Sequence, residues 1–225
     1  TCGFDWLFID MEHNAMSVEQ AVQLSVAAQD AGITPLVRVP DFAHHHATRV
    51  LDGGAMGIVA PHVDTAEEAA RIVANCKFPP VGHRSIAGAQ AQLDFAALPL
   101  GEAARAVNEA TLVVIMLETP RAIENLDAIA KVPGIDVLLI GTNDLCMEMG
   151  IPGQLDDRRI GEVYAAVIAA CWANGIHPGM GGVYAPALIE RYIALGMRFV
   201  LAGSDLSLMM AAAAERTAFL RGLSL

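Results

Sequence analysis

The sequence predicts an α/β fold built around a parallel sheet, and a TIM barrel is the simplest form of it. Short apolar runs such as residues 111–117 (TLVVIML) alternate with longer helical stretches. These runs are uninterrupted, which is typical of parallel strands covered on both faces. No Gly-x-Gly-x-x-Gly motif follows a predicted strand, and no linker divides the chain. We therefore expect a single domain over residues 1–225, with a doubly wound open sheet as the alternative.

The expected elements alternate regularly along the chain. Strands are predicted near residues 4–10, 34–38, 56–60, 111–117, 136–140, 176–179 and 198–201. Helices are predicted near residues 17–31, 44–53, 65–75, 120–131, 159–174, 185–195 and 205–222. Thr65 and Glu68 form a predicted capping box, and Pro120 suits a first helical turn. Residues 79–110 are predicted to form a long loop of the kind that often carries function.

The number of predicted strand–helix units is one fewer than a complete TIM barrel contains. Seven strand–helix units are expected, whereas a TIM barrel has eight. The chain starts at Thr1 rather than at a methionine, and the first predicted strand follows within a few residues. We therefore expect the first strand–helix unit of the barrel to be missing from this sequence.

Composition narrows the class of protein. The formal net charge is −11 with only 14 Lys and Arg residues, which argues against nucleic acid as a partner. No apolar run reaches the ~18 residues that a membrane span needs, so no membrane partner is expected. The four cysteines form no Cys-x-x-Cys pair, which is typical of reduced thiols in a cytoplasmic protein. No motif calls for an organic cofactor.

Polar residues gather where the predicted strands end. The ends carry, in chain order, Asp10, Glu12 and His13, then Arg38, then His62 and Asp64, then Glu118, and finally Asp144. In a TIM barrel the carboxyl ends of the strands surround the site of chemistry. Each of these residues also has an ordinary reading, as a solvated loop residue or a hydrogen-bonded histidine. Their shared position nevertheless favours a site at this end of the barrel.

Two of these acids indicate a metal. Glu118 and Asp144 end consecutive predicted strands, so their carboxylates are expected to converge and to repel without a cation between them. Two oxygen ligands with room for water and substrate suit Mg²⁺, Mn²⁺ or Co²⁺ better than a closed zinc site. The run His44 to His46 falls at a helix start, where consecutive side chains diverge, so we do not expect it to bind metal.

Seven segments together resemble a known family. They are FDWLFIDMEH, LVRVP, LDGGAMGIVAPHVDTAEEA, FPPVGHRS, ETPRAIENLDAIAKVPGID, IGTNDL and LGMRFVLAGSD. In this order they are similar to the HpcH/HpaI aldolases, which are metal-dependent, class II pyruvate aldolases of the 4-hydroxy-2-oxoheptanedioate and 2-keto-3-deoxy-sugar-acid type. The resemblance covers nearly the whole chain. It implies an enzyme that makes or cleaves the bond between pyruvate, or a related 2-oxo acid such as hydroxypyruvate, and an aldehyde.

The resemblance also implies roles for individual residues. It places the metal ligands at Glu118 and Asp144, the catalytic histidine at His13 and the enolate-stabilising arginine at Arg38. It implies that Asp52 partners the histidine across a subunit interface, in a homo-oligomer such as a hexamer or trimer of dimers with exchanged helices.

Further roles are expected from position. The backbone amides of Gly141, Thr142 and Asn143 follow a strand directly and are expected to bind the substrate carboxylate beside Asp144. Asp10 and Glu12 are expected to support the residues around them rather than to react, although Glu12 has the alternative of reaching a neighbouring subunit. No lysine ends a predicted strand, which argues against a Schiff-base aldolase.

Two other functions remain open at this stage. One is a lyase for CoA thioesters of the citrate lyase β-chain or malyl-CoA lyase type, although a CoA ligand calls for more basic residues than this chain has. The other is a barrel without activity that serves as a binding module. Retention of His13, Arg38, Glu118 and Asp144 together favours an enzyme.

Overall fold

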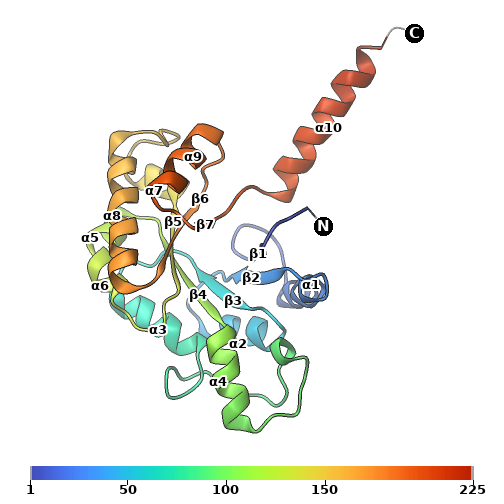
Figure 1. Cartoon of the computed structure of the whole chain (residues 1–225), viewed down its shortest axis with the longest axis vertical. Helices are drawn as coiled ribbons and strands as arrows, with labels where there is room; N and C mark the ends of the chain where they lie inside the picture. The colour runs from blue at the N-terminus through green and yellow to red at the C-terminus, as the bar shows by residue number, and fades with distance from the viewer. Residues whose placement is uncertain (1, 224–225) are drawn as a thin grey trace.

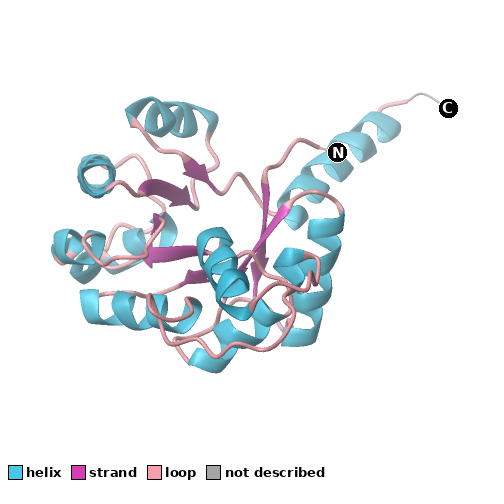
Figure 2. Cartoon of the chain, turned by 60° about the horizontal axis from the view of Figure 1, so that its bottom comes forward, coloured by secondary structure: helices cyan, strands magenta, loops and turns pink. Residues whose placement is uncertain are grey.

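The computed structural model describes residues 2–223, and they form one curled parallel sheet with helices around it (Figures 1 and 2). The strands are β1 (Trp6–Asp10), β2 (Thr34–Arg38), β3 (Gly57–Ala60), β4 (Leu112–Leu117), β5 (Val137–Gly141), β6 (His177–Gly181) and β7 (Phe199–Val200). Each strand pairs in parallel with the next one along the chain, in the order β1 to β7. A doubly wound sheet reverses its order partway, so that alternative was wrong, and the expected strands are confirmed.

The sheet curls far enough for its two edge strands to approach each other. Trp6 on β1 and Phe199 on β7 stack with ring centroids 4.1 Å apart. Within residues 2–223 the sheet has seven strands. The structure therefore shows a curled, seven-stranded parallel sheet, and the closed barrel of eight strands stays a prediction.

The strands divide their side chains between two cores. Inward-facing residues form a small cluster within the curl, namely Leu36, Val59, Val114, Met116, Val137 and Leu139. Their neighbours along the strands, such as Val37, Ile115 and Leu138, pack outward into a larger cluster with the helices. Because both faces are buried, the strands read as continuous apolar runs rather than alternating ones.

The helices agree with the sequence in most places and differ in three. They are α1 (Val18–Asp30), α2 (His44–Asp52), α3 (Ala66–Cys76), α4 (Leu100–Ala110), α5 (Pro120–Glu124), α6 (Leu126–Ala130), α7 (Thr142–Glu148), α8 (Arg158–Asn174), α9 (Pro186–Leu195) and α10 (Asp205–Arg221), with a short 3-10 turn η1 (Ala91–Leu93). The single helix expected over 120–131 is split at Asn125. Helices α4 and α7 were not predicted, and α4 occupies part of the expected long loop 79–110.

Two predicted helix starts are confirmed. The Thr65 hydroxyl accepts from the backbone N–H of Glu68, while the Glu68 carboxylate accepts from the Thr65 N–H, which completes the capping box of α3. Pro120 lies in the first turn of α5, where its missing N–H costs nothing. These caps fix where the chain turns back from the carboxyl ends of β3 and β4.

Helix α10 departs from the rest of the molecule. Figure 1 shows it extending away from the sheet, with the chain end at its far tip. All of its residues are exposed, including Leu206, Leu208, Met209, Met210 and Phe219. None of the helices within residues 2–223 is both long and apolar enough to span a membrane.

Candidate active site

A cavity of about 350 Å³ opens at the carboxyl ends of the strands. It is lined by Phe8, His13, Arg38, Met116, Leu139, Gly141, Thr142, Asn143, Asp144, Gly181, Gly182, Tyr184 and Leu201. These residues come from β1, β2, β4, β5 and β6, from the segments that follow them, and from the segment after β7. The curled sheet thus brings three of the polar residues that the sequence singled out, His13, Arg38 and Asp144, to one cavity, as expected for parallel strands.

Arg38 is held by two acids on one side of the cavity. Its Nε and Nη2 donate to the two Asp10 carboxylate oxygens at 2.9 and 2.6 Å, and its Nη1 lies 2.9 Å from Glu12 Oε2. Burial is the largest influence on the pKa of Arg38 and acts to lower it, but the hydrogen bonds to Asp10 and the charges of Asp10, Glu12 and Glu118 together raise it above the usual value. Burial likewise acts to raise the pKa of Asp10, yet Arg38 and the backbone N–H groups of Glu12 and His13 together hold it below the usual value. Both acids therefore contact the predicted catalytic arginine directly.

His13 lies at the entrance of the cavity. Its side chain is 61% exposed, and its Nε2 lies 3.8 Å from Glu12 Oε2. The backbone N–H groups of Glu12 and His13 both point at Asp10 Oδ1, at 3.0 and 3.4 Å. The loop that carries the histidine is thus held by the same carboxylate that orients Arg38, and the ring is free to meet a ligand.

Glu118 is a buried carboxylate with two acidic neighbours, Asp144 and Glu12. Its side chain is 1% exposed. Burial raises its pKa, the neighbouring Asp144 and Glu12 carboxylates raise it further, and the backbone N–H and ring of His62 oppose the shift. Gly141 makes room for it: a Cβ there would lie 2.6 Å from Glu118 Cγ and 2.7 Å from its Oε1. The fold accommodates this carboxylate only because residue 141 has no side chain.

The donor set at this position fits a divalent ion. Within residues 2–223 no group of three or more His, Cys, Asp and Glu side chains has the arrangement of a closed metal site. Glu118 and Asp144 remain as a pair of oxygen donors, and the buried member of the pair is surrounded by negative charge. An ion with mostly water and substrate ligands suits such an open site.

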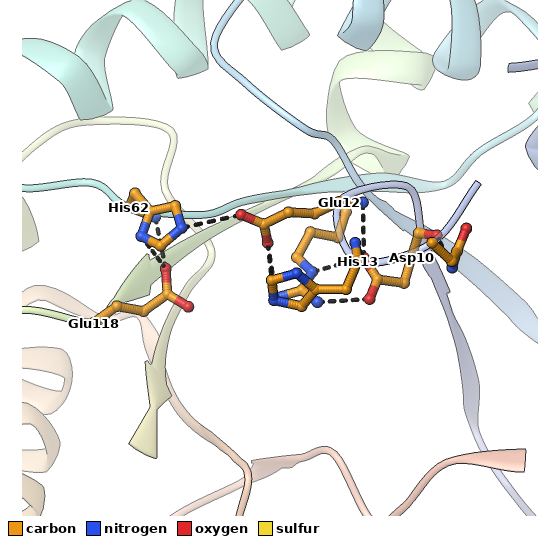
Figure 3. Close-up of polar contacts among 7 residues, drawn as sticks. Asp10, Glu12, His13, His62 and Glu118 are labelled. Atoms are coloured by element: carbon orange, nitrogen blue, oxygen red, sulfur yellow. Dashed lines mark hydrogen bonds and ion pairs between the residues drawn. The ribbon is translucent and has the colours of Figure 1, made fainter. Parts of the chain in front are cut away.

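His62 lies between Glu118 and Glu12, as Figure 3 shows. Its backbone N–H donates to Glu118 Oε2 at 2.7 Å. Its Nδ1 lies 3.4 Å from the same oxygen, and its Nε2 lies 3.0 Å from Glu12 Oε1. The sequence placed His62 at a strand end but gave it no role. Its position there, directly after a buried strand, was the signal that could have identified it.

The segment after β5 forms the opposite wall. Gly141, Thr142, Asn143 and Asp144 all line the cavity where α7 begins. The Thr142 hydroxyl faces away from the cavity, since it shares a 2.7 Å hydrogen bond with the buried Tyr164 hydroxyl. Carboxylate binding by the backbone amides of this segment stays a prediction.

Asp52 lies at a different end of the molecule from His13. It is the last residue of α2, which returns from the carboxyl end of β2 toward the start of β3. Its Oδ1 accepts from Nη2 of the buried Arg84 at 2.6 Å. Asp64 is also outside the cavity, where its side chain accepts from the Thr119 hydroxyl and its carbonyl accepts from Asn125. It joins the segments that follow β3 and β4.

Known proteins of similar sequence and structure share one family. Residues 1–212 match the model of the HpcH/HpaI aldolase/citrate lyase family. The chain is 42% identical over 217 residues to a 4-hydroxy-4-methyl-2-oxoglutarate aldolase of Hapsidospora irregularis, covering 95% of this chain and 80% of that protein. It is 33% identical over 207 residues to a hydroxypyruvate/pyruvate aldolase of Agrobacterium fabrum, covering 92% and 77%.

A solved structure agrees with these sequence matches. The crystal structure of an HpcH/HpaI aldolase from Desulfitobacterium hafniense superposes with a TM-score of 0.92 at 28% identity, covering 99% of this chain and 85% of that one. Matches in sequence and in structure thus extend over nearly the whole chain. The protein belongs to the HpcH/HpaI aldolase/citrate lyase family.

Proposed function

We propose that this protein is a class II aldolase that makes or cleaves the carbon–carbon bond between pyruvate, or a related 2-oxo acid such as hydroxypyruvate, and an aldehyde. It is a carbon–carbon lyase, as its aldolase relatives are by name. One observation carries the proposal: His13, Arg38 and Asp144 line a single cavity, and the buried Glu118 lies against its wall at Gly141.

In this proposal the carboxylates of Glu118 and Asp144 would bind Mg²⁺, Mn²⁺ or Co²⁺. Bound there, the ion supplies Lewis-acid stabilisation of the negative charge that develops when a 2-oxo acid loses a methyl proton. The raised pKa of Glu118, caused first by burial and then by its acidic neighbours, supports a cation at this place.

Arg38 and His13 divide the remaining work. Arg38 is fixed by its two bonds to Asp10, so its positive charge is already in place to stabilise the enolate oxygen. His13 is exposed to the cavity, so directly or through a water it would take the methyl proton of the 2-oxo acid. In the cleavage direction it would instead take the proton from the 4-hydroxyl group. The amides of Gly141 to Asn143 are proposed to bind the substrate carboxylate.

The position of the lysines supports the metal route over a Schiff base. Lys77 caps α3, where its ammonium group donates to the Asn108 and Thr111 carbonyls just before β4 begins. Lys131 ends α6, before β5. The chain has no other lysine. Both therefore lie near the amino ends of the strands, away from the cavity, where a Schiff-base lysine is not expected.

Assembly completes the proposal. Helix α10 exposes a long apolar surface, and Asp52 lies at the end of its own subunit opposite His13. We therefore propose a homo-oligomer, such as a hexamer with exchanged α10 helices, in which Asp52 orients His13 of a neighbour. We further propose that the complete barrel has eight strands, with the additional one between β7 and β1. A cytoplasmic location remains an expectation from the cysteines.

Proton exchange on pyruvate tests the proposed chemistry. Enzyme with Mn²⁺ in deuterated water should exchange the methyl protons of pyruvate for deuterium when no aldehyde is present. Proton NMR, recorded after the metal is removed, measures the decrease of the methyl signal. A lyase for CoA thioesters would leave pyruvate unchanged and require a thioester, and a binding module would exchange nothing. Absence of exchange with every 2-oxo acid tested would refute the aldolase proposal.

A further inference from the structure

We infer that His62 is a positioning residue that links the metal side of the site to the arginine side. The inference rests on the function proposed above, because it concerns how Glu118 and Arg38 are held ready for that reaction. His62 is the residue through which the described chain connects these two groups: Glu118 to His62, His62 to Glu12, and Glu12 to Arg38.

The first contact divides the Glu118 carboxylate into two unlike oxygens. Oε2 accepts from the backbone N–H of His62 at 2.7 Å and also faces the Nδ1 of its ring at 3.4 Å. Oε1 lies against Gly141, which lines the cavity. His62 therefore holds one oxygen, which leaves the other in a fixed position for a ligand ion.

The second contact joins the His62 ring to Glu12, and it also divides a carboxylate between two partners. Glu12 presents Oε1 to His62 Nε2 at 3.0 Å and Oε2 to Arg38 Nη1 at 2.9 Å. The imidazole ring thus lies between the carboxylates of Glu12 and Glu118, two groups of like charge that repel each other. Without the ring, repulsion would push them apart and would loosen Arg38 on one side and the metal ligand on the other.

The backbone conformation of His62 is strained, and this strain supports a positioning role. Its φ is +52°, in the left-handed region that residues other than glycine seldom adopt. Within residues 2–223 two other non-glycine residues share this conformation, Asp94 and Phe95, and they lie in the segment between η1 and α4. A strained backbone persists where its surroundings hold it. At His62 the same conformation lets both the backbone N–H and the ring reach Glu118.

Three variants separate the ring from the backbone. His62→Gly removes the ring while suiting the positive φ. His62→Asn also tolerates this φ, and its amide takes the place of Nδ1 beside Glu118. Asp94→Gly is the matched control, since it replaces another left-handed residue outside the cavity. Thermal unfolding of each variant verifies folding, and the free Mn²⁺ signal in electron paramagnetic resonance measures metal affinity without substrate.

We expect His62→Gly to bind Mn²⁺ about 10–100-fold more weakly than the parent, the usual effect of losing a group that orients a metal ligand. His62→Asn should recover only part of that affinity, because its amide restores the contact with Glu118 and not the one with Glu12, and Asp94→Gly should match the parent. A parent protein that binds no Mn²⁺ would refute the proposed function itself. A parent that binds normally, with His62→Gly within threefold of it, would overturn only the positioning role, and a His62→Asn variant equal to the parent would overturn the link to Glu12.

Discussion

Trp6 and Phe199 stack with their ring planes 18° apart, although they belong to the two edge strands of the described sheet. Trp6 also lies 6.2 Å from Phe8, centroid to centroid, and Phe8 lines the cavity. The aromatic contact therefore closes the curl of the described sheet where β1 and β7 begin, and Phe8 continues the aromatic surface from there toward the cavity.

A double-mutant cycle measures this closure. Trp6→Ala and Phe199→Ala should each lower the free energy of unfolding, and the pair should show a coupling of about 0.5–1.5 kcal/mol, because stacked aromatic rings contribute beyond the area they bury. Urea unfolding at one fixed protein concentration provides the values. Strictly additive effects would show that the two rings touch without stabilising each other.

Metal dependence is the second prediction. Chelation should abolish activity, and Mn²⁺, Co²⁺ or Mg²⁺ should restore it. Glu118→Gln and Asp144→Asn should weaken Mn²⁺ binding beyond the ~10–100-fold that loss of a supporting contact costs, since each removes a charged ligand. Glu148→Gln, at the exposed end of the same helix as Asp144, should change nothing. Full activity of the chelated protein would contradict the mechanism.

The third prediction concerns Arg38. Arg38→Ala should slow exchange of the pyruvate methyl protons by about 10²–10³-fold, the usual cost of a lost oxyanion donor. Mn²⁺ binding should not weaken, because the change removes a positive charge from an acidic site. Arg71→Ala is a control, as that guanidinium lies over Phe42 outside the cavity. Exchange at the parent rate would remove Arg38 from the mechanism.

His13 should affect the chemistry and leave the metal in place. His13→Ala should slow both exchange and cleavage by about 10²–10⁴-fold, the range for a general base. Its Mn²⁺ affinity should equal that of the parent, because the ring is mostly exposed and is predicted to be a base rather than a ligand. The exposed His45 on α2 provides a control as His45→Ala. A variant that loses metal together with activity would make His13 a ligand instead.

Assembly is the fifth prediction. Met209→Glu together with Phe219→Glu should reduce the molecular mass seen by light scattering, since charges on α10 oppose burial of its apolar surface. Thr217→Glu adds charge to the same helix at a polar, exposed position and should leave the assembly intact. If Asp52 acts on a neighbour, the smaller species should also lose activity. An active monomer would exclude that role.

The strands were predictable from the sequence, and some helices were not. A continuous run such as Leu112–Leu117 is buried on both faces, so its apolar character reports its structure directly. Helix α4 was overlooked because Pro99 and Gly101 resemble loop residues, although Ala103 and Val107 form its buried face. The break at Asn125 carries no proline or glycine signal, and the side-chain amide of this residue donates to the Asp64 carbonyl, a contact between distant segments that local sequence does not report.

The sequence predicted where the polar side chains gather but not how they contact each other. The carboxyl ends of parallel strands converge, so position alone predicted that Arg38 and Asp144 face one cavity. The bonds between Arg38 and Asp10 depend on side-chain directions that no spacing encodes. The sequence also gives no signal for the positive φ of His62, because residues other than glycine seldom have a positive φ. In the structure this conformation accompanies the bond from the His62 N–H to the Glu118 carboxylate.

The strand order has a consequence for how the chain reaches its native state. Every strand pairs with the one before it, so each new strand can add to a neighbour already formed, at a small cost in loop entropy. The contact between residues 6 and 199 is different, since it joins the two ends of this series. Among the described strands, folding by successive addition would leave that contact until last, and the parts of the cavity wall carried by β1 and β7 would come together only in this late step.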